Sequence, residues 1–177
     1  MAAATTTTTT VRVPPSGTYR VDPVTSTVHF TTRHLFGLAR VKGSFAVVSG
    51  EVIIAQPALA STATAVIDAA SFVTGNTRRD NDVKSATFLA VASHPRITFR
   101  STELARDGAT WRLRGHITAR GTTAPVELTV VEATTTGQSL VLRATAKVDR
   151  YAHGISKVKG MAGRYLNLEI TAFATRL

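Results

Sequence analysis

The feature that most constrains this chain is an alternation of apolar and polar residues with a period of two, interrupted by short turn signals. The dipeptides Ser49-Gly50, Asp107-Gly108 and Thr136-Gly137 each sit between two alternating runs. A glycine-containing dipeptide between alternating runs is typical of a β-hairpin. The sequence therefore predicts an antiparallel meander.

The alternation also fixes where the strands run and which face of each strand is apolar. It predicts strands over 17–22, 25–33, 39–49, 51–55, 61–68, 96–104, 110–120, 126–133, 139–149 and 166–175. The clearest register is that of 139–149, where one face is Leu140, Leu142, Ala144, Ala146 and Val148. A slip of one residue would bury Arg143 and Lys147, so this register is well specified.

The inward-facing set is apolar but small. Its alanines are Ala63, Ala65, Ala119, Ala144, Ala146, Ala172 and Ala174. Barrels of about eight strands are just wide enough to be filled by side chains or to hold one ligand. We therefore expect a closed sheet lined by these residues to leave space at its centre.

Length and composition favour one domain. The chain has 177 residues and no cysteine, which excludes a disulfide scaffold and a thiolate metal site. We expect residues 1–16, a Thr- and Pro-rich leader, to be disordered and 17–177 to form a single domain. Residues 1–10 show neither a basic region nor an apolar region of a signal peptide, so we expect a cytoplasmic protein.

The alternation stops between Ala69 and Pro95. The polar run 76–84 predicts a short helix, and Phe72, Phe88, Leu89 and Val91 flank it. This long connection is expected to fold back over one end of the barrel as a lid. Within it we interpret Arg78, Arg79 and Asp80 as a solvated, helix-capping cluster in preference to a headgroup clamp.

The formal net charge is +10, and part of it forms a stripe on the outer face of 111–120: Arg112, Arg114, His116 and Arg120. A basic protein is drawn to nucleic acid, anionic lipid or acidic partners. Nucleic-acid modules usually add exposed aromatic residues. Aromatic residues of all kinds make up only 6% of this chain, and most fall on the inward register or in one loop. We expect no nucleic-acid partner and leave open a transient contact with an anionic membrane surface.

Motifs for chemistry are missing from the sequence. The histidines His29, His34, His94, His116 and His153 form no metal-binding spacing, so we expect no metal. No nucleophile elbow, phosphate-binding loop or dinucleotide fingerprint occurs. We expect a protein that is not an enzyme and requires no cofactor.

Several blocks of residues together resemble the YceI-like lipid-binding family. In chain order they are 22–30, 33–37 with 41–45, 74–76 with Arg79-Asp80, 84–88, 94–101, 115–118 with 121–126, and Arg150-Tyr151 with Gly154-Ile155. The chain departs from the family at Thr87 and Ala90, where acidic residues are usual, and at Val83, where Leu is usual.

The resemblance implies an all-β fold: an extended antiparallel, lipocalin-like β-barrel with a short helical lid segment. It further implies a hydrophobic pore that holds a polyisoprenoid, an isoprenoid quinone or another long-chain lipid, and a homodimer. We therefore expect non-catalytic binding or transport of a long-chain amphiphile. The alternative is an enzyme that acts on a lipid or quinone-like substrate in the same tunnel.

Candidate ligand-binding residues are the aromatic, apolar or polar groups expected inside the barrel or at its mouth. They are Phe30, His34, Phe36, Phe45, Phe72, Phe88, Phe99, Ile117 and Tyr151. Each inward aromatic could instead be ordinary core, and His34 could instead bond to the backbone of its turn.

Overall fold

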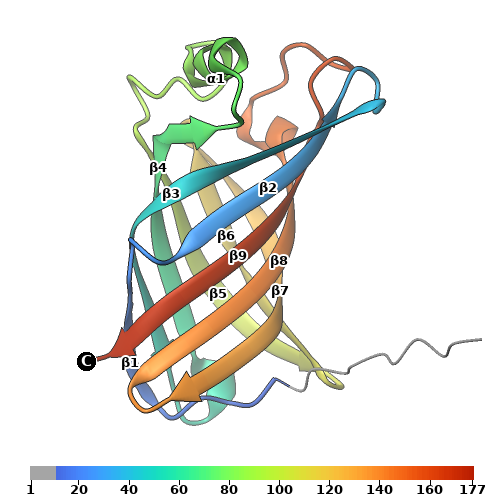
Figure 1. Cartoon of the computed structure of the whole chain (residues 1–177). Coiled ribbons are helices and arrows are strands. Elements are labelled where there is room, and N and C mark those ends of the chain that lie inside the picture. Colours follow the sequence, from blue (N-terminus) through green and yellow to red (C-terminus); the bar gives the residue numbers. More distant parts are fainter. Residues whose placement is uncertain (1–10) are drawn as a thin grey trace, which may run out of the picture.

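Across residues 11–177, which the computed structural model describes, nine strands form one antiparallel sheet that closes on itself (Figure 1). The strands are β1 (Gly17–Val21), β2 (Thr27–His34), β3 (Ala39–Ile54), β4 (Thr62–Val73), β5 (Arg96–Asp107), β6 (Thr110–Ala119), β7 (Thr122–Thr136), β8 (Ser139–Asp149) and β9 (Tyr165–Arg176). The predicted all-β barrel with a helical lid is confirmed.

Closure of the barrel depends on the long strand β3. Its first half pairs with β2 and its second half with β1, while its other edge pairs with β4. Both β1 and β2 also pair with β9, so these two strands share one position in the wall. The barrel therefore has eight strand positions.

Two of the three predicted hairpin turns are present, and one is wrong. Asp107-Gly108 joins β5 to β6, and Thr136-Gly137 joins β7 to β8. Ser49-Gly50 instead lies inside β3, where the two residues pair with Val66 and Ala65 of β4. A two-residue hairpin needs a positive φ, and Gly50 has none. The alternation of apolar and polar residues is interrupted there because the register between β3 and β4 shifts between Val47 and Ser49. The strand predicted separately over 51–55 is the second half of β3.

The predicted helix is α1 (Thr77–Lys84), which lies over one end of the barrel in Figure 1. The Asn76 side chain caps it by accepting a hydrogen bond of 3.0 Å from the Arg79 amide. Strand β4 continues to Val73, beyond its predicted end, so Phe72 belongs to the strand and not to the connection. Two short 3₁₀ helices complete the structure, η1 (Ala58–Ala60) and η2 (Arg150–His153).

Buried apolar side chains form two separate clusters. The base cluster, at the end that holds β1, is Tyr19, Val21, Val52, Ile54, Leu140 and Ala174. The lid cluster, near α1, is Phe30, Phe72, Leu89 and Ile155. A barrel filled from end to end would show one continuous core, so two clusters indicate a change in packing between its ends.

The predicted basic stripe on β6 is partly neutralised by acidic neighbours. Arg112 pairs with Glu127 at 2.7 Å, and Arg114 pairs with Glu127 at 2.9 Å and with Glu103 at 3.0 Å. These are cross-strand pairs on a solvated face, so they help to set strand register and offset part of the positive charge there.

The predicted disordered leader falls largely outside the described residues, which exclude 1–10. Residues 11–16 form neither a helix nor a strand. The Pro15 carbonyl accepts a hydrogen bond of 2.8 Å from the Tyr19 hydroxyl, which ties this segment to the base cluster.

Leu140→Ala tests the base cluster, because Leu140 is only 1% exposed. Removing a buried leucine side chain should cost about 2–5 kcal/mol of the free energy of unfolding. Leu38→Ala is the matched control, since Leu38 is 88% exposed and its truncation should change stability by less than about 0.5 kcal/mol. Equilibrium denaturation by urea measures both, and equal losses would contradict the assignment.

Candidate ligand-binding cavity

A cavity of about 550 Å³ occupies the barrel and extends to its lid end. Alternate residues of the long strands face it along part of their length; on β9 these are Leu166, Leu168, Ile170 and Ala172. The stretch from Leu166 to Ala172 covers about 20 Å of strand at roughly 3.3 Å per residue. The cavity is therefore long, and its wall follows from the alternation that builds the sheet.

Small side chains keep this space open. Six of the predicted inward alanines line the cavity: Ala63, Ala65, Ala119, Ala144, Ala146 and Ala172. Ala174 is the exception, because it packs into the base cluster. A methyl group at these positions reaches only a short way into the barrel, so the wall does not fill its own centre.

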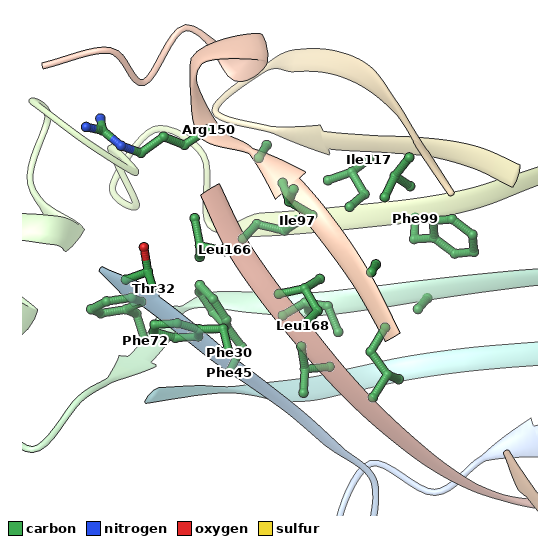
Figure 2. Close-up of a pocket in the computed structure, with 18 of the residues that line it drawn as sticks. Phe30, Thr32, Phe45, Phe72, Ile97, Phe99, Ile117, Arg150, Leu166 and Leu168 are labelled. Carbon is green, nitrogen blue, oxygen red and sulfur yellow. The ribbon is translucent and has the colours of Figure 1, made fainter. Parts of the chain in front are cut away.

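Three phenylalanines gather toward the lid end (Figure 2). The ring centroids of Phe30 and Phe72 are 5.2 Å apart, those of Phe45 and Phe72 are 5.4 Å apart, and those of Phe30 and Phe45 are 5.6 Å apart. Gly43 lies opposite Phe30 across β2 and β3, and a Cβ there would overlap the Phe30 ring. A glycine at this position thus lets the aromatic group pack against the wall.

Most of the predicted site residues line the cavity. They are Phe30, His34, Phe45, Phe72, Phe88, Phe99 and Ile117. Phe99 and Ile117 are direct cross-strand partners on β5 and β6, as the alternation required.

Two predicted site residues lie outside the cavity lining. Phe36 is 77% exposed on the turn between β2 and β3, so its ring points away from the barrel interior. Tyr151, on η2, packs its ring under two guanidinium groups, those of Arg150 at 4.9 Å and Arg164 at 5.0 Å. An aromatic residue in a turn has no alternation to place it, so the sequence does not show whether such a ring faces the cavity.

The lid contributes an apolar surface to the cavity. Val83 of α1, and Phe88 and Leu89 after it, face the interior. The Arg120 guanidinium donates a hydrogen bond of 2.9 Å to the Ala86 carbonyl, which fastens the lid connection to the turn between β6 and β7. The segment therefore folds back over the end of the barrel, as predicted.

Asp80 anchors the lid to the end of β4. Its carboxylate accepts hydrogen bonds from the Thr74 amide at 3.0 and 3.1 Å and from the Thr74 hydroxyl. Asp80 is 7% exposed, so its predicted place in a solvated cluster is wrong. Burial favours the neutral acid, but the Thr74 hydrogen bonds and the charges of Lys84 and Arg79 hold the pKa of Asp80 below its ordinary value.

Arg150 is a cavity-lining cation that the sequence reasoning did not select. It is 7% exposed, and its guanidinium donates to the carbonyls of Gly163 at 2.7 Å, Ile155 at 2.6 Å and Ala162 at 2.9 Å. Burial lowers the pKa of Arg150 from its usual value. The sequence held a signal for its inward position, because Arg150 continues the series of even-numbered residues of β8 that face the cavity.

The hydrogen bonds of Arg150 organise the segment that precedes β9. Three of the five N–H donors of the guanidinium are used by main-chain carbonyls. The nearby carboxylate of Asp149 pairs instead with Arg164, at 2.7 Å. Among residues 11–177, no carboxylate oxygen lies within salt-bridge distance of Arg150, so its positive charge is not neutralised by an acidic side chain.

Two other features are absent from the described residues 11–177. No three His, Asp or Glu side chains are grouped so that they could hold a metal ion. No helix in the same part of the chain has the length and apolar character that crossing a bilayer requires.

The fold and the cavity define a class of protein: a closed β-barrel with a long apolar interior that opens at one end. Within that class the chain belongs to the YceI-like family, because the family model described as YceI-like domain matches residues 19–174.

Curated relatives agree with this membership over part of their length. A UPF0312 protein of Pectobacterium carotovorum is 34% identical over 102 residues, which are 57% of this chain and 53% of the relative. Protein YceI of Escherichia coli is 35% identical over 103 residues, with the same two shares. The aligned part thus spans about half the length of the curated relatives it matches.

Solved structures share the fold. BcnA of Burkholderia cenocepacia superposes with a TM-score of 0.77 at 21% identity, over 88% of this chain and 99% of that one. A polyisoprenoid binding domain from Saccharophagus degradans superposes with a TM-score of 0.68 at 13% identity, over 92% and 100%.

Asp80→Asn tests the anchor of the lid. The folded-state pKa lies below the value of the unfolded chain, about 3.9, so the carboxylate stabilises the fold above that pH. This contribution is lost as the pH falls through the folded-state pKa. The variant should lose about 1–3 kcal/mol at pH 7, and the difference from the parent should shrink in acid.

Denaturation curves measured across pH check this expectation. Asp82→Asn is the matched control, because Asp82 is an exposed carboxylate of the same helix at the edge of the cavity, and it should change stability by less than about 0.5 kcal/mol. A deficit of Asp80→Asn that stays constant down to the acid limit would contradict the role of the ionised carboxylate.

Arg150→Met tests the cation that organises the segment before β9. Three main-chain carbonyls would lose a charged donor, so we expect a loss of about 3–5 kcal/mol in the free energy of unfolding. Arg150→Lys should recover only part of it, because an ammonium cannot reproduce the planar fork.

The matched control is Arg96→Met, which breaks an exposed pair with Asp68 of 3.3 Å. Such surface pairs contribute about 0–1 kcal/mol. Amide hydrogen exchange in 155–163 locates the effect: rapid exchange is expected in Arg150→Met, and unchanged protection would show that other contacts hold the segment.

Proposed function

We propose that this protein binds one long-chain amphiphile of polyisoprenoid type, with the tail inside the barrel, and performs no chemical step on it. The observation that carries the proposal is the cavity of about 550 Å³, whose wall is apolar along most of its length. Its volume falls within the roughly 300–1,000 Å³ range of small-molecule sites.

The energetics favour a long tail over a short one. Each buried methylene contributes about 0.8 kcal/mol, so about ten of them contribute roughly 8 kcal/mol. Association costs on the order of 4–15 kcal/mol in lost freedom of motion. A tail of about ten methylenes therefore offsets a cost in the lower half of that range through burial alone, whereas a much shorter tail does not reach the range.

The lid end of the cavity suits the polar end of the ligand. In Figure 2 the labelled polar side chains, Thr32 and Arg150, both lie toward the end that holds Phe72, while Phe99 and Ile117 lie farther along. The uncompensated positive charge of Arg150 favours a headgroup that accepts hydrogen bonds or is anionic, and disfavours a cationic one.

The hydrogen bonding of the lining polar groups supports binding without catalysis. Thr32 donates to the Tyr165 carbonyl at 2.8 Å, and a ring nitrogen of His153 lies 3.0 Å from the Thr122 carbonyl. Ser26 bonds to the main chain of Phe173 in both directions. These hydroxyl and imidazole groups pair with backbone, not with one another, and so do not form a nucleophile and its base.

The structural neighbours add support at the level of fold. One of them is described as a polyisoprenoid binding domain, and it superposes over 92% of this chain. The same fold therefore occurs in a protein with that description.

Native mass spectrometry and lipid extraction of the purified protein test the proposal. We expect one long-chain lipid per chain, or stoichiometric uptake of added geranylgeraniol. Ala144→Trp should fill the middle of the cavity and weaken uptake about tenfold or more, because an indole would occupy the space of the tail.

Thr145→Trp is the matched control, since Thr145 is the neighbouring exposed residue of β8 and its substitution should leave uptake unchanged. Comparison of hexadecanoate with hexadecylamine tests the headgroup, and the acid should bind better. A protein that is empty as purified and takes up neither probe would refute the proposal, as would equal uptake by the two tryptophan variants.

A further inference from the structure

Five large apolar side chains are exposed at the lid end of the barrel and form what we call the rim patch. Its members are Leu35, Phe36, Leu38, Val158 and Met161. They come from the β2–β3 turn and from the segment that precedes β9, which project beyond the same end of the barrel in Figure 1. Contiguous exposed apolar groups on a soluble fold mark an interaction surface.

The two segments form one surface because their backbones are joined. The Leu35 amide donates to the Met161 carbonyl at 2.9 Å, and the Phe36 amide donates to the Gly160 carbonyl at 2.7 Å. The Phe36 ring covers Gly160, where a Cβ would overlap it. The rim patch is therefore a built feature and not two independent loops.

The backbone of the rim patch holds large residues in an unfavourable conformation. Leu35, Phe36 and Val158 have φ values of 52°, 54° and 55°. This left-handed region suits Gly, Asn or Asp, and a bulky or β-branched residue there costs about 1–3 kcal/mol. Turns of this kind could be made more stable with polar residues, yet the chain places apolar groups outward at these positions.

Basic residues predominate on the two segments of the rim patch, and of these Arg164 is paired with Asp149 at 2.7 Å. Residues 33–42 contain Arg33, Arg40 and Lys42, and residues 150–164 contain Arg150, Lys157, Lys159 and Arg164. Neither range contains an acidic residue. Exposed apolar groups within a field of Lys and Arg are typical of surfaces that bind anionic lipid.

The rim patch is continuous with the cavity. Val158 and Met161 belong to both, and His34 and Ala162, which adjoin the patch, also line the cavity. An apolar path therefore runs from exposed side chains at the tip of the barrel into its interior.

We propose that the rim patch docks the protein on the surface of an anionic bilayer. Phe36 and Leu38 enter the boundary between headgroups and acyl chains, and the surrounding cations contact lipid phosphates. The purpose of the docking rests on the proposed function: it would bring the mouth of the cavity to the membrane that holds the long-chain ligand. A second copy of the chain fits less well, because two-fold pairing would place the same cations opposite one another.

Vesicle sedimentation with the full chain tests the docking surface. Vesicles of phosphatidylcholine with about one third phosphatidylglycerol should bind the protein about tenfold or more tightly than vesicles of phosphatidylcholine alone. The double variant Phe36→Asp, Leu38→Asp should lose about tenfold or more of that affinity. Val24→Asp is the matched control, because Val24 is 89% exposed and lies just before β2, at the opposite end of that strand from the rim patch. The Val24→Asp variant should bind vesicles as the parent does.

Two further measurements separate apolar insertion from charge attraction. Leu38→Trp should show a blue-shifted emission on vesicles, over a constant background from Trp111, which is buried. Lys157→Glu with Lys159→Glu should weaken binding to anionic vesicles several-fold. Binding that is unaffected by the double aspartate variant would overturn the proposal, and so would an unshifted Leu38→Trp emission on bound vesicles.

The oligomeric state gives a third readout. If the parent ignores both kinds of vesicle but sediments as a dimer that the double aspartate variant dissociates, the rim patch is an interface between copies and the proposal is wrong.

The experiments also distinguish docking from ligand binding. The double aspartate variant should still take up geranylgeraniol from solution, since neither substituted residue lines the cavity. Vesicle binding by a protein that takes up no lipid would refute the proposed function and leave docking standing. Uptake of lipid without vesicle binding would refute docking and leave the proposed function standing.

Discussion

Closure of the sheet between β3 and β4 is the constraint on which the rest of the structure depends. An open sheet would let the inner face spread and pack, whereas a closed wall of eight positions fixes the interior volume. Once that volume is fixed, the size of the inward side chains decides how much of it is filled. Alanines such as Ala65, Ala144 and Ala146 fill little, so closure and small residues together produce the cavity.

The two ends of the barrel solve different packing problems. At the base, Tyr19 and Leu140 are almost completely buried, and β1 completes the wall where β2 does not reach. At the lid end, polar groups hold the chain in place: Asp80 binds Thr74, and Arg150 binds three carbonyls before β9. The base is closed by the strands of the wall themselves, whereas the lid is a separate connection held by the lid cluster and these few hydrogen bonds, so the lid end is the easier one to open.

Much of the fold could be read from the period-two pattern, because a closed antiparallel barrel imposes the same inside-outside rule on every strand. The rule placed Phe30, Phe99 and Ile117 correctly, since each lies within a regular strand. It failed at Ser49-Gly50, because a bulge and a turn interrupt alternation in the same way, and only the pairing partner distinguishes them. It had nothing to say about Phe36 and Tyr151, whose positions depend on turns and on contacts with distant segments.

The failures at the lid end are informative about function. Arg150 lies just beyond the predicted strand 139–149, and its partners are carbonyls that a sequence does not reveal. Its hydrogen bonds shape the same segment that carries Val158 and Met161, so a buried cation supports an exposed apolar surface. Under the proposed function and the proposed docking, a long-chain molecule would enter at the apolar, basic mouth, and its tail would lie where the alanines leave space.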